Sequence, residues 1–470
     1  MNRLCSIITC DATAAWRRIG QGETLPATAV KKCGRGPIIL NSSSGAVICR
    51  DKLMAGKFKP RLLLLLCLLP APAFSNPPLQ LYIALTPTGG TLVPDPGVYS
   101  GPVIIDRKMV IDGQGKVTID GDDNETVVTI NANGVELRNL RIINSGDSHN
   151  RLDAGLLVNG SNNIVENLTI DNCLFGIHLR KSDGNLIRGN KVSSKDYDIS
   201  MRGEGLRLWY SHDNTITNNV FSHVRDLVIT NASDNRFVGN RIDHSRIGME
   251  FVFSPDNEII GNTLHYNATG ITVLYSNDLV IRDNHISHMR KLTGSGLAFK
   301  ESSQVVIEGN QLIHCAVGLR ANAPIHPENI LYARRNTLLF NDIAMYFYGE
   351  KGGHVIHDND FINNFADVIG SASMTVRDND WLGNYWDRYA GYDFNEDGRG
   401  DLPHEIHLYS DRIWRDRPMT KFFRGSPALS VVDFVERLAP FSPPELVLRD
   451  PAPRMHGRLG TIYPTSRTAQ

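Results

Sequence analysis

The stretches Phe237-Val238-Gly239-Asn240-Arg241-Ile242 and Ile259-Ile260-Gly261-Asn262-Thr263-Leu264 share one arrangement of apolar residues around an asparagine. The pattern is apolar-x-x-Asn-x-apolar, and its asparagines recur 20 to 29 residues apart along the chain. It also occurs at Ile187–Val192, Ile216–Phe221, Ile281–Ile286, Ile307–Leu312, Ala333–Leu338, Ile356–Phe361 and Val376–Trp381. A repeat of this length is typical of a solenoid, in which each repeat adds one coil to a continuous core.

Each repeat also contains a second short strand that begins at a glycine. In Gly176-Ile177-His178-Leu179, alternation directs Ile177 and Leu179 inward and His178 outward. Short strands between Asn and Gly turns predict an all-β fold, a right-handed parallel β-helix solenoid, with coils about 4.8 Å apart. The recurrent asparagines are expected to stack into an amide ladder at a corner. A β-propeller is disfavoured because its unit is nearer ~40 residues.

The sequence divides into four expected parts. Residues 1–53 lack clear periodicity and are interpreted as a misassigned start or a disordered extension. Residues 54–75 have the form of a secretory signal peptide, with a basic stretch, an apolar run and small residues. A membrane anchor would need a longer apolar run of ~20 residues. Residues 76–382 are assigned to the β-helix, and residues 383–470 to a C-terminal capping segment and tail with a short helix.

Charge and cysteine usage fit an exported protein. The first 75 residues hold 11 Lys or Arg and 3 Asp or Glu, whereas the whole chain holds 49 and 50, so the part beyond residue 75 is acidic. An acidic protein is a poor nucleic-acid binder. Beyond residue 75 the only cysteines are Cys173 and Cys315. They are expected to be buried thiols, because about six coils, roughly 30 Å, would separate them.

Some coils are lengthened by loops that carry histidine and methionine. His288 and Met289 lie in one such loop, and His285 lies just outside it. Thioether and imidazole groups suit Cu(I), so His285, His288 and Met289 are a candidate copper site. The alternative is that they are ordinary surface residues.

The segment after the last repeat contains half of a calcium-loop pattern. Asp393, Asn395 and Asp397 alternate before Gly398, and Asp401 falls at the ninth position. The twelfth position, where an EF-hand has Glu, is a histidine, so the match is partial. A calcium-binding loop and a metal-free turn rich in Asx residues are both left open.

The same segment carries a resemblance to a known family. A β-helix followed by Asn384-Tyr385-Trp386, Gly391-Tyr392-Asp393 and Asp397-Gly398-Arg399-Gly400-Asp401 resembles NosD proteins. The resemblance implies a periplasmic, non-catalytic accessory protein of nitrous oxide reductase maturation in denitrification. It implies copper as the cargo, and an ABC transporter permease, a copper chaperone and the reductase as partners. An amphipathic helix expected at Val431–Leu438 could cap the last coil, dock on the permease, or do both.

The alternative function is that of a polysaccharide-acting β-helix enzyme, a lyase, hydrolase or epimerase. Such enzymes need a base or paired carboxylates on the outer face. The outward positions include Arg207 and Glu250, which are interpreted as a surface charge pair and not as an acid–base couple. The sequence therefore favours a non-enzymatic role.

Overall fold

The computed structural model describes residues 76–324, 326–408 and 445–458, with a few isolated positions between 426 and 438. The expected N-terminal extension (residues 1–53) and signal peptide (residues 54–75) lie outside the described residues. Most of the expected helix at Val431–Leu438 lies outside them as well. Within the described part, no helix is long and apolar enough to cross a membrane.

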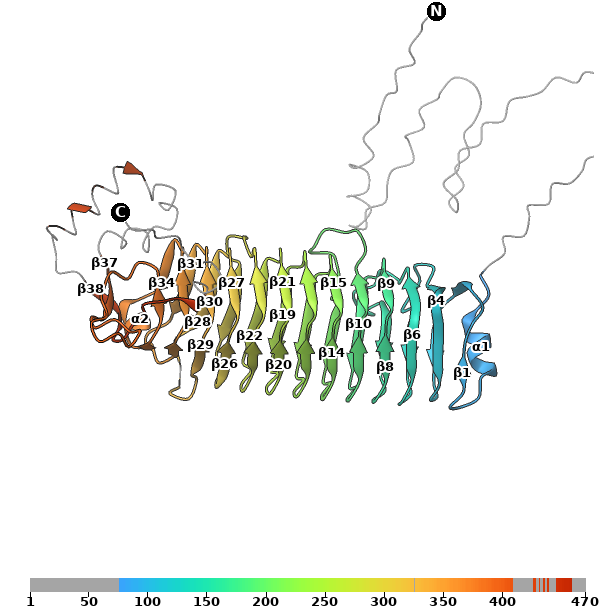
Figure 1. Ribbon diagram of the computed structural model, residues 1–470. Coiled ribbons are helices and arrows are strands. Elements are labelled where there is room, and N and C mark those ends of the chain that lie inside the picture. Colours follow the sequence, from blue (N-terminus) through green and yellow to red (C-terminus); the bar gives the residue numbers. More distant parts are fainter. Residues whose placement is uncertain are drawn as a thin grey trace, which may run out of the picture. The chain divides into compact units, whose positions relative to one another are not determined.

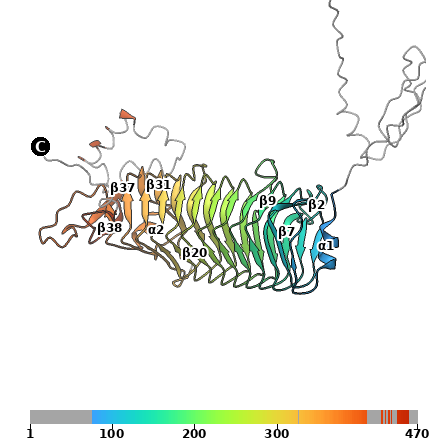
Figure 2. The ribbon, with the colours of Figure 1, turned by 45° about the vertical axis from the view of Figure 1, so that its right-hand side comes forward.

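The described chain winds into a parallel β-solenoid of about 13 turns, which confirms the predicted fold class. Figures 1 and 2 show the coils stacked in sequence order along one axis. Each coil adds one strand to a 12-stranded sheet and two strands to a 24-stranded sheet, and all of these pairings are parallel. Every coil therefore pairs with the one before and the one after.

The 24-stranded sheet has two rows of strands. The first row is β1 (Thr91–Leu92), β8 (Ile164–Glu166), β11 (Leu186–Arg188), β14 (Thr215–Thr217), β17 (Arg236–Val238), β20 (Glu258–Ile260), β23 (Val280–Arg282), β26 (Val305–Glu308), β29 (Leu331–Arg334), β32 (Val355–His357) and β35 (Asp380–Leu382). The second row is β2 (Gly97–Ser100), β9 (Thr169–Asp171), β12 (Lys191–Ser193), β15 (Val220–Ser222), β18 (Arg241–Asp243), β21 (Thr263–His265), β24 (His285–Ser287), β27 (Gln311–Ile313), β30 (Thr337–Leu339), β33 (Asp360–Ile362) and β36 (Tyr385–Trp386). The longer strands β4 (Val110–Asp120) and β6 (Glu136–Ile143) pair in both rows.

The 12-stranded sheet forms the other wall of the solenoid. Its strands are β3 (Val103–Ile105), β5 (Val128–Ile130), β7 (Ala154–Val158), β10 (Phe175–Arg180), β13 (Leu206–Trp209), β16 (Asp226–Thr230), β19 (Ile247–Val252), β22 (Thr269–Leu274), β25 (Ser295–Lys300), β28 (Val317–Asn322), β31 (Ile343–Tyr348) and β34 (Ala366–Gly370).

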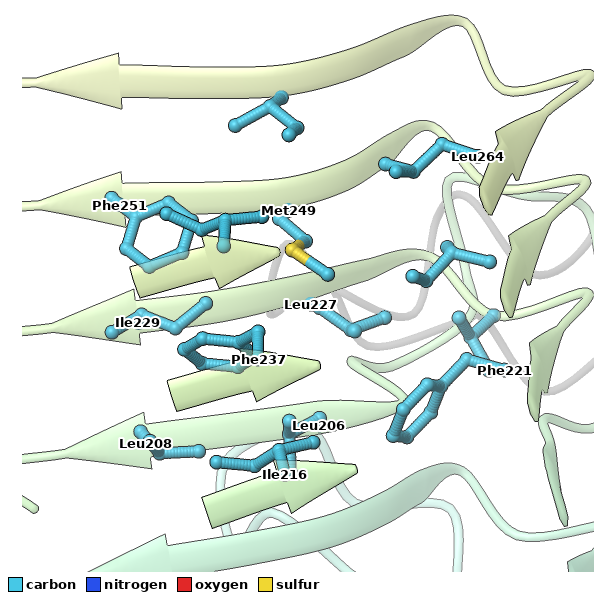
Figure 3. Packing of buried hydrophobic residues seen from close by; sticks show 14 of the residues in the cluster. Leu206, Leu208, Ile216, Phe221, Leu227, Ile229, Phe237, Met249, Phe251 and Leu264 are labelled. Carbon is cyan, nitrogen blue, oxygen red and sulfur yellow. The ribbon is translucent and has the colours of Figure 1, made fainter. Parts of the chain in front are cut away.

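The interior is filled by one continuous apolar core. Each strand turns alternate side chains inward, so Ile216, Phe221 and Leu208 of one coil are all fully buried. Figure 3 shows these residues with Phe237 and Phe251 from the following coils. Cys173 and Cys315 are buried free thiols, as expected, and burial raises the pKa of both to about 12.

An asparagine ladder follows the corner between the two rows. In each coil the backbone N–H of the recurrent Asn donates to Oδ1 of its equivalent in the next coil, over 2.8–3.0 Å. The ladder runs through Asn190, Asn219, Asn240, Asn262, Asn284, Asn310, Asn336, Asn359 and Asn384. The expected stacking is therefore present.

The last member of the ladder differs from the predicted pattern. The pattern Val376–Trp381 points to Asn379, but the structure continues the ladder through Asn384. Asn379 instead accepts hydrogen bonds from the backbone N–H groups of Gly353 and His354, which directly precede the first-row strand β32. The short helix α2 (Ser373–Arg377) shifts the spacing of this final coil.

Both ends of the described solenoid are covered. Helix α1 (Leu79–Leu85) buries Leu79 and Ile83 against the first coils. At the other end, β37 (His404–Leu408) and β38 (Glu445–Asp450) form an antiparallel pair. The buried Asp450 accepts hydrogen bonds from Asn384 and from Trp386 Nε1, so it ends the asparagine ladder.

Candidate metal centre

A column of rings runs along the corner that follows the second row of strands. In the coils of Asn219 to Asn310, the residue four places after the recurrent Asn occupies this corner, and its backbone is left-handed, with φ of 54°–63°. In five successive coils these residues are His223, His244, Tyr266, His288 and His314, here called the ring ladder. The repeat thus brings four imidazoles from distant parts of the sequence to one edge.

The rings of the ladder lie close together. His223 and His244 stack with centroids 4.7 Å apart and planes 5° apart. Tyr266 lies 5.6 Å from His244 and 4.7 Å from His288, and His288 meets His314 edge-on at 5.0 Å. The stacking follows from the coil spacing of about 4.8 Å.

A carboxylate completes a cluster of ligand atoms at one end of the ladder. His223, Asp243 and His244 each offer a ligand atom, and these atoms lie within 4.8 Å of one another. Asp243 Oδ1 accepts a hydrogen bond from Ser222 (2.5 Å) and lies 3.0 Å from His244 Nδ1, while Oδ2 lies 3.0 Å from Arg241. Burial alone raises the pKa of Asp243, but the bonds from His244 and Ser222 and the charge of Arg241 bring the pKa below its ordinary value. The group is therefore a carboxylate.

Further along, two imidazole nitrogens are buried without hydrogen-bond partners among the described residues. They are Nε2 of His265, on β21, and Nδ1 of His288. Burial lowers the pKa of both residues. Arg241 lowers the pKa of His265 further, although Asp243 raises it, and His314 and then His285 lower the pKa of His288 further. These imidazoles are neutral at pH 7, which is the form that binds a metal ion.

The ladder leads into a cavity of about 1010 Å³. Its walls include His288, His314, the exposed ring of Phe340, and Asp387 beside Arg388. Asp387 Oδ1 is buried without a hydrogen-bond partner among the described residues. The cavity thus gives a ligand or partner access to the end of the ladder.

The structure removes one residue, Met289, from the predicted copper site. His288 belongs to the ring ladder, and His285 Nδ1 lies 3.1 Å from Gln311 Oε1 on the neighbouring strand. Met289 is 0% exposed and packs in the apolar core, as does Cys315 at the equivalent position of the next coil. Met289 is therefore not on the surface with the two histidines.

The residues of the calcium-like pattern come together in one exposed turn. Asp393 accepts hydrogen bonds from the backbone N–H of Asp397 and Gly398, at 3.2 and 2.8 Å. Asp401 accepts one from the N–H of Phe394 at 2.7 Å, and Asn395 bonds to Asp397. The loop's own backbone engages these carboxylates, as in an Asx turn. Calcium binding here stays a prediction.

Sequence reasoning missed His223, Asp243, His244, His265 and His314. The signal was available in the repeat itself, because aligning the recurrent asparagines places His, His, Tyr, His and His at the same phase. The next position in each coil is buried, which would also have placed Met289 inside.

Comparison with known proteins bears directly on this edge of the molecule. Residues 192–391 match the family model described as periplasmic copper-binding protein (NosD), and residues 110–228 match the right-handed β-helix region. A probable ABC transporter binding protein NosD of Pseudomonas aeruginosa is 28% identical over 385 residues, covering 76% of this chain and 85% of that protein. The chain is similar to NosD proteins over most of its length. The whole ring ladder lies inside the segment that matches the NosD model.

Other similarities are shorter or structural. A NosD protein of Stutzerimonas stutzeri is 36% identical over 86 residues, covering 18% of this chain and 20% of that protein. The A-modules of the Azotobacter vinelandii mannuronan C-5 epimerases AlgE6 and AlgE4 align with TM-scores of 0.46, at 15% and 14% identity. These alignments cover 60% and 62% of this chain and 87% and 92% of those structures. Similarity at this level carries no argument about function.

Proposed function

We propose that this chain is a member of the NosD family, a periplasmic, non-catalytic accessory protein that handles copper together with an ABC transporter. Its target is nitrous oxide reductase, whose copper sites it helps to assemble. The observation that carries the proposal is the ring ladder with Asp243, because imidazole and carboxylate groups gathered at one edge can hold copper. The family description and the name of the Pseudomonas relative support the same role.

The partners follow from that role. Copper reaches the ring ladder from a copper chaperone, and the ABC transporter permease is the membrane partner. Export through a cleaved signal peptide at residues 54–75 would bring the chain to the compartment of its family.

The contacts of the outer face favour this proposal over a polysaccharide-acting enzyme. Arg207 does not pair with Glu250, because the strand register places Val228 between them. Arg207 instead approaches Glu204 to 3.9 Å, and Glu204 also pairs with Arg225. Arg207 is therefore engaged with Glu204 and does not form a couple with Glu250.

The proposal is tested by copper binding and by reductase assembly. The variant His223→Asn/His244→Asn/His288→Asn/His314→Asn removes the imidazoles but keeps the corner, because Asn occupies the same left-handed position at Asn172 and Asn363. We expect it to lose most bound copper and to leave nitrous oxide reductase copper-poor in cells. The control His326→Ala/His456→Ala removes two exposed histidines outside the ladder. Equal copper content in the ladder variant and the control would overturn the proposal.

A further inference from the structure

The ring ladder has an aromatic interruption that divides its histidines into two groups. Tyr266 stands between His244 and His288, and its ring is 56% exposed. His244 and His288 are therefore two coils apart, roughly 9.6 Å at the strand spacing. A single ion with metal–nitrogen bonds of about 2 Å cannot join ligands much more than ~4 Å apart. One ion cannot use both groups.

We infer that the ring ladder binds two metal ions, one on each side of Tyr266, with different ligand sets. The inference rests on the proposed copper-handling function and specifies how its site is built. The first position comprises His223, Asp243 and His244. The second comprises imidazoles alone, His265 and His288, which come from adjacent coils.

The first position is defined by the cluster of ligand atoms. His223, Asp243 and His244 already place one ligand atom each within 4.8 Å of the other two. Bonds of about 2 Å require these atoms to move closer by roughly 1 Å, within the reach of side-chain rotation. Two imidazoles and a carboxylate form a nitrogen–oxygen set without sulfur, which suits divalent copper.

The second position is defined by independent evidence, the unpartnered nitrogens. His265 Nε2 and His288 Nδ1 are buried, and no described residue bonds to either atom. A buried polar atom without a partner destabilises the fold, so its persistence points to a ligand that the nitrogen binds. His314 meets the His288 ring at 5.0 Å and lines the adjoining cavity.

The two positions differ in what surrounds them. The first is bounded by Arg241 and Ser222, which both donate hydrogen bonds to the carboxylate of Asp243. An ion bound there competes with these two donors for the carboxylate oxygens. The second opens toward the cavity beside Phe340 and Arg388. An ion at the second position is therefore the one that a molecule in the cavity can reach.

The test counts ions in the purified protein after Cu(II) is added and unbound metal is removed. We expect two equivalents in the unchanged protein and in the control His326→Ala/His456→Ala. We expect one equivalent in His223→Asn/His244→Asn, one in His288→Asn/His314→Asn, and none when all four are changed. Tyr266→Phe keeps the ring without its hydroxyl and is expected to retain two.

Electron paramagnetic resonance identifies the first position. In His288→Asn/His314→Asn, the remaining Cu(II) should show two nitrogen couplings, and a further Asp243→Asn change should shift its spectrum. A single equivalent that either pair of substitutions abolishes would overturn the inference, because it means one shared ion. Two equivalents that survive both pairs would also overturn it. Absence of binding in the unchanged protein would instead remove the proposed copper-handling function.

Discussion

Individual side chains in the ring ladder are prepared for metal binding by their surroundings. Burial and the neighbouring histidines lower the pKa values of His265 and His288, so both imidazoles stay neutral below the pH at which an ordinary histidine gains a proton. A neutral imidazole keeps its lone pair for the metal, and protons compete only below the lowered pKa.

The pH dependence of copper binding tests this statement. In His223→Asn/His244→Asn, which leaves only the second group of histidines, two ordinary imidazoles would weaken copper binding about a hundredfold between pH 7.5 and 5.5. Because the pKa values of His265 and His288 are lowered, we expect a loss clearly smaller than that. Competition with a chelator at the two pH values measures the change. A hundredfold loss would show that these imidazoles titrate normally.

Residue types at the corner could be only partly predicted. The recurrent Asn was recognisable because its amide is required in every coil, whereas the fold accepts His, Tyr, Phe or Asn at the exposed corner position. Met289 was misplaced because a loop sequence does not reveal which position faces inward. The buried equivalents Val224 and Cys315 reveal it once the coils are aligned.

Strands and corners depend on the asparagine ladder between them. Asn262 is 1% exposed, accepts hydrogen bonds from the N–H and Nδ2 of Asn240, and donates to Phe237 O and Asn284 Oδ1. These bonds join three successive coils through one side chain. The asparagine ladder is therefore a buried, structural part of the fold and not a set of solvent-exposed polar turns.

Replacement of Asn262 by alanine should be strongly destabilising. It leaves the N–H of Asn240 and the carbonyl oxygen of Phe237 without these partners, and each buried group costs about 1–3 kcal/mol. We expect a loss of at least about 2 kcal/mol in the free energy of unfolding, measured with urea. Asn150→Ala, in an exposed loop, is the control and should stay within about 0.5 kcal/mol. Similar midpoints for both variants would contradict the role of the ladder.

Most strands could be predicted because period-two alternation and turn residues recur in every coil. The final coil could not, because α2 replaces the regular spacing and moves the ladder from the expected Asn379 to Asn384. An irregular insertion carries no periodic signal.

The solenoid as a whole is held by neighbour-to-neighbour contacts, so its ends need their own partners. Asp450 supplies one end, since its carboxylate accepts from the N–H of Gly383, the N–H and Nδ2 of Asn384, and Trp386 Nε1. The sequence indicated a cap beyond residue 383 but not Asp450, which lies 66 residues from Asn384 along the chain.

Loss of the Asp450 carboxylate should loosen one end selectively. In Asp450→Ala, hydrogen exchange should become faster in β32, β33, β35 and β36, because their coils lose acceptors for four buried donors. Exchange in β5 to β9 should not change, because those coils do not touch the cap. Asp450→Asn keeps one acceptor oxygen and should give a smaller effect. Uniformly faster exchange along the chain would contradict the claim that each coil is stabilised mainly by the coils next to it.

The most direct test of the account is the position of copper in crystals of the protein grown with Cu(II) and measured at the copper absorption edge. The account predicts anomalous-scattering peaks at the corner of the coils, one beside His223 and His244 and one beside His288. Peaks confined to the Asp393–Asp401 turn, or to histidines outside the ring ladder, would contradict it.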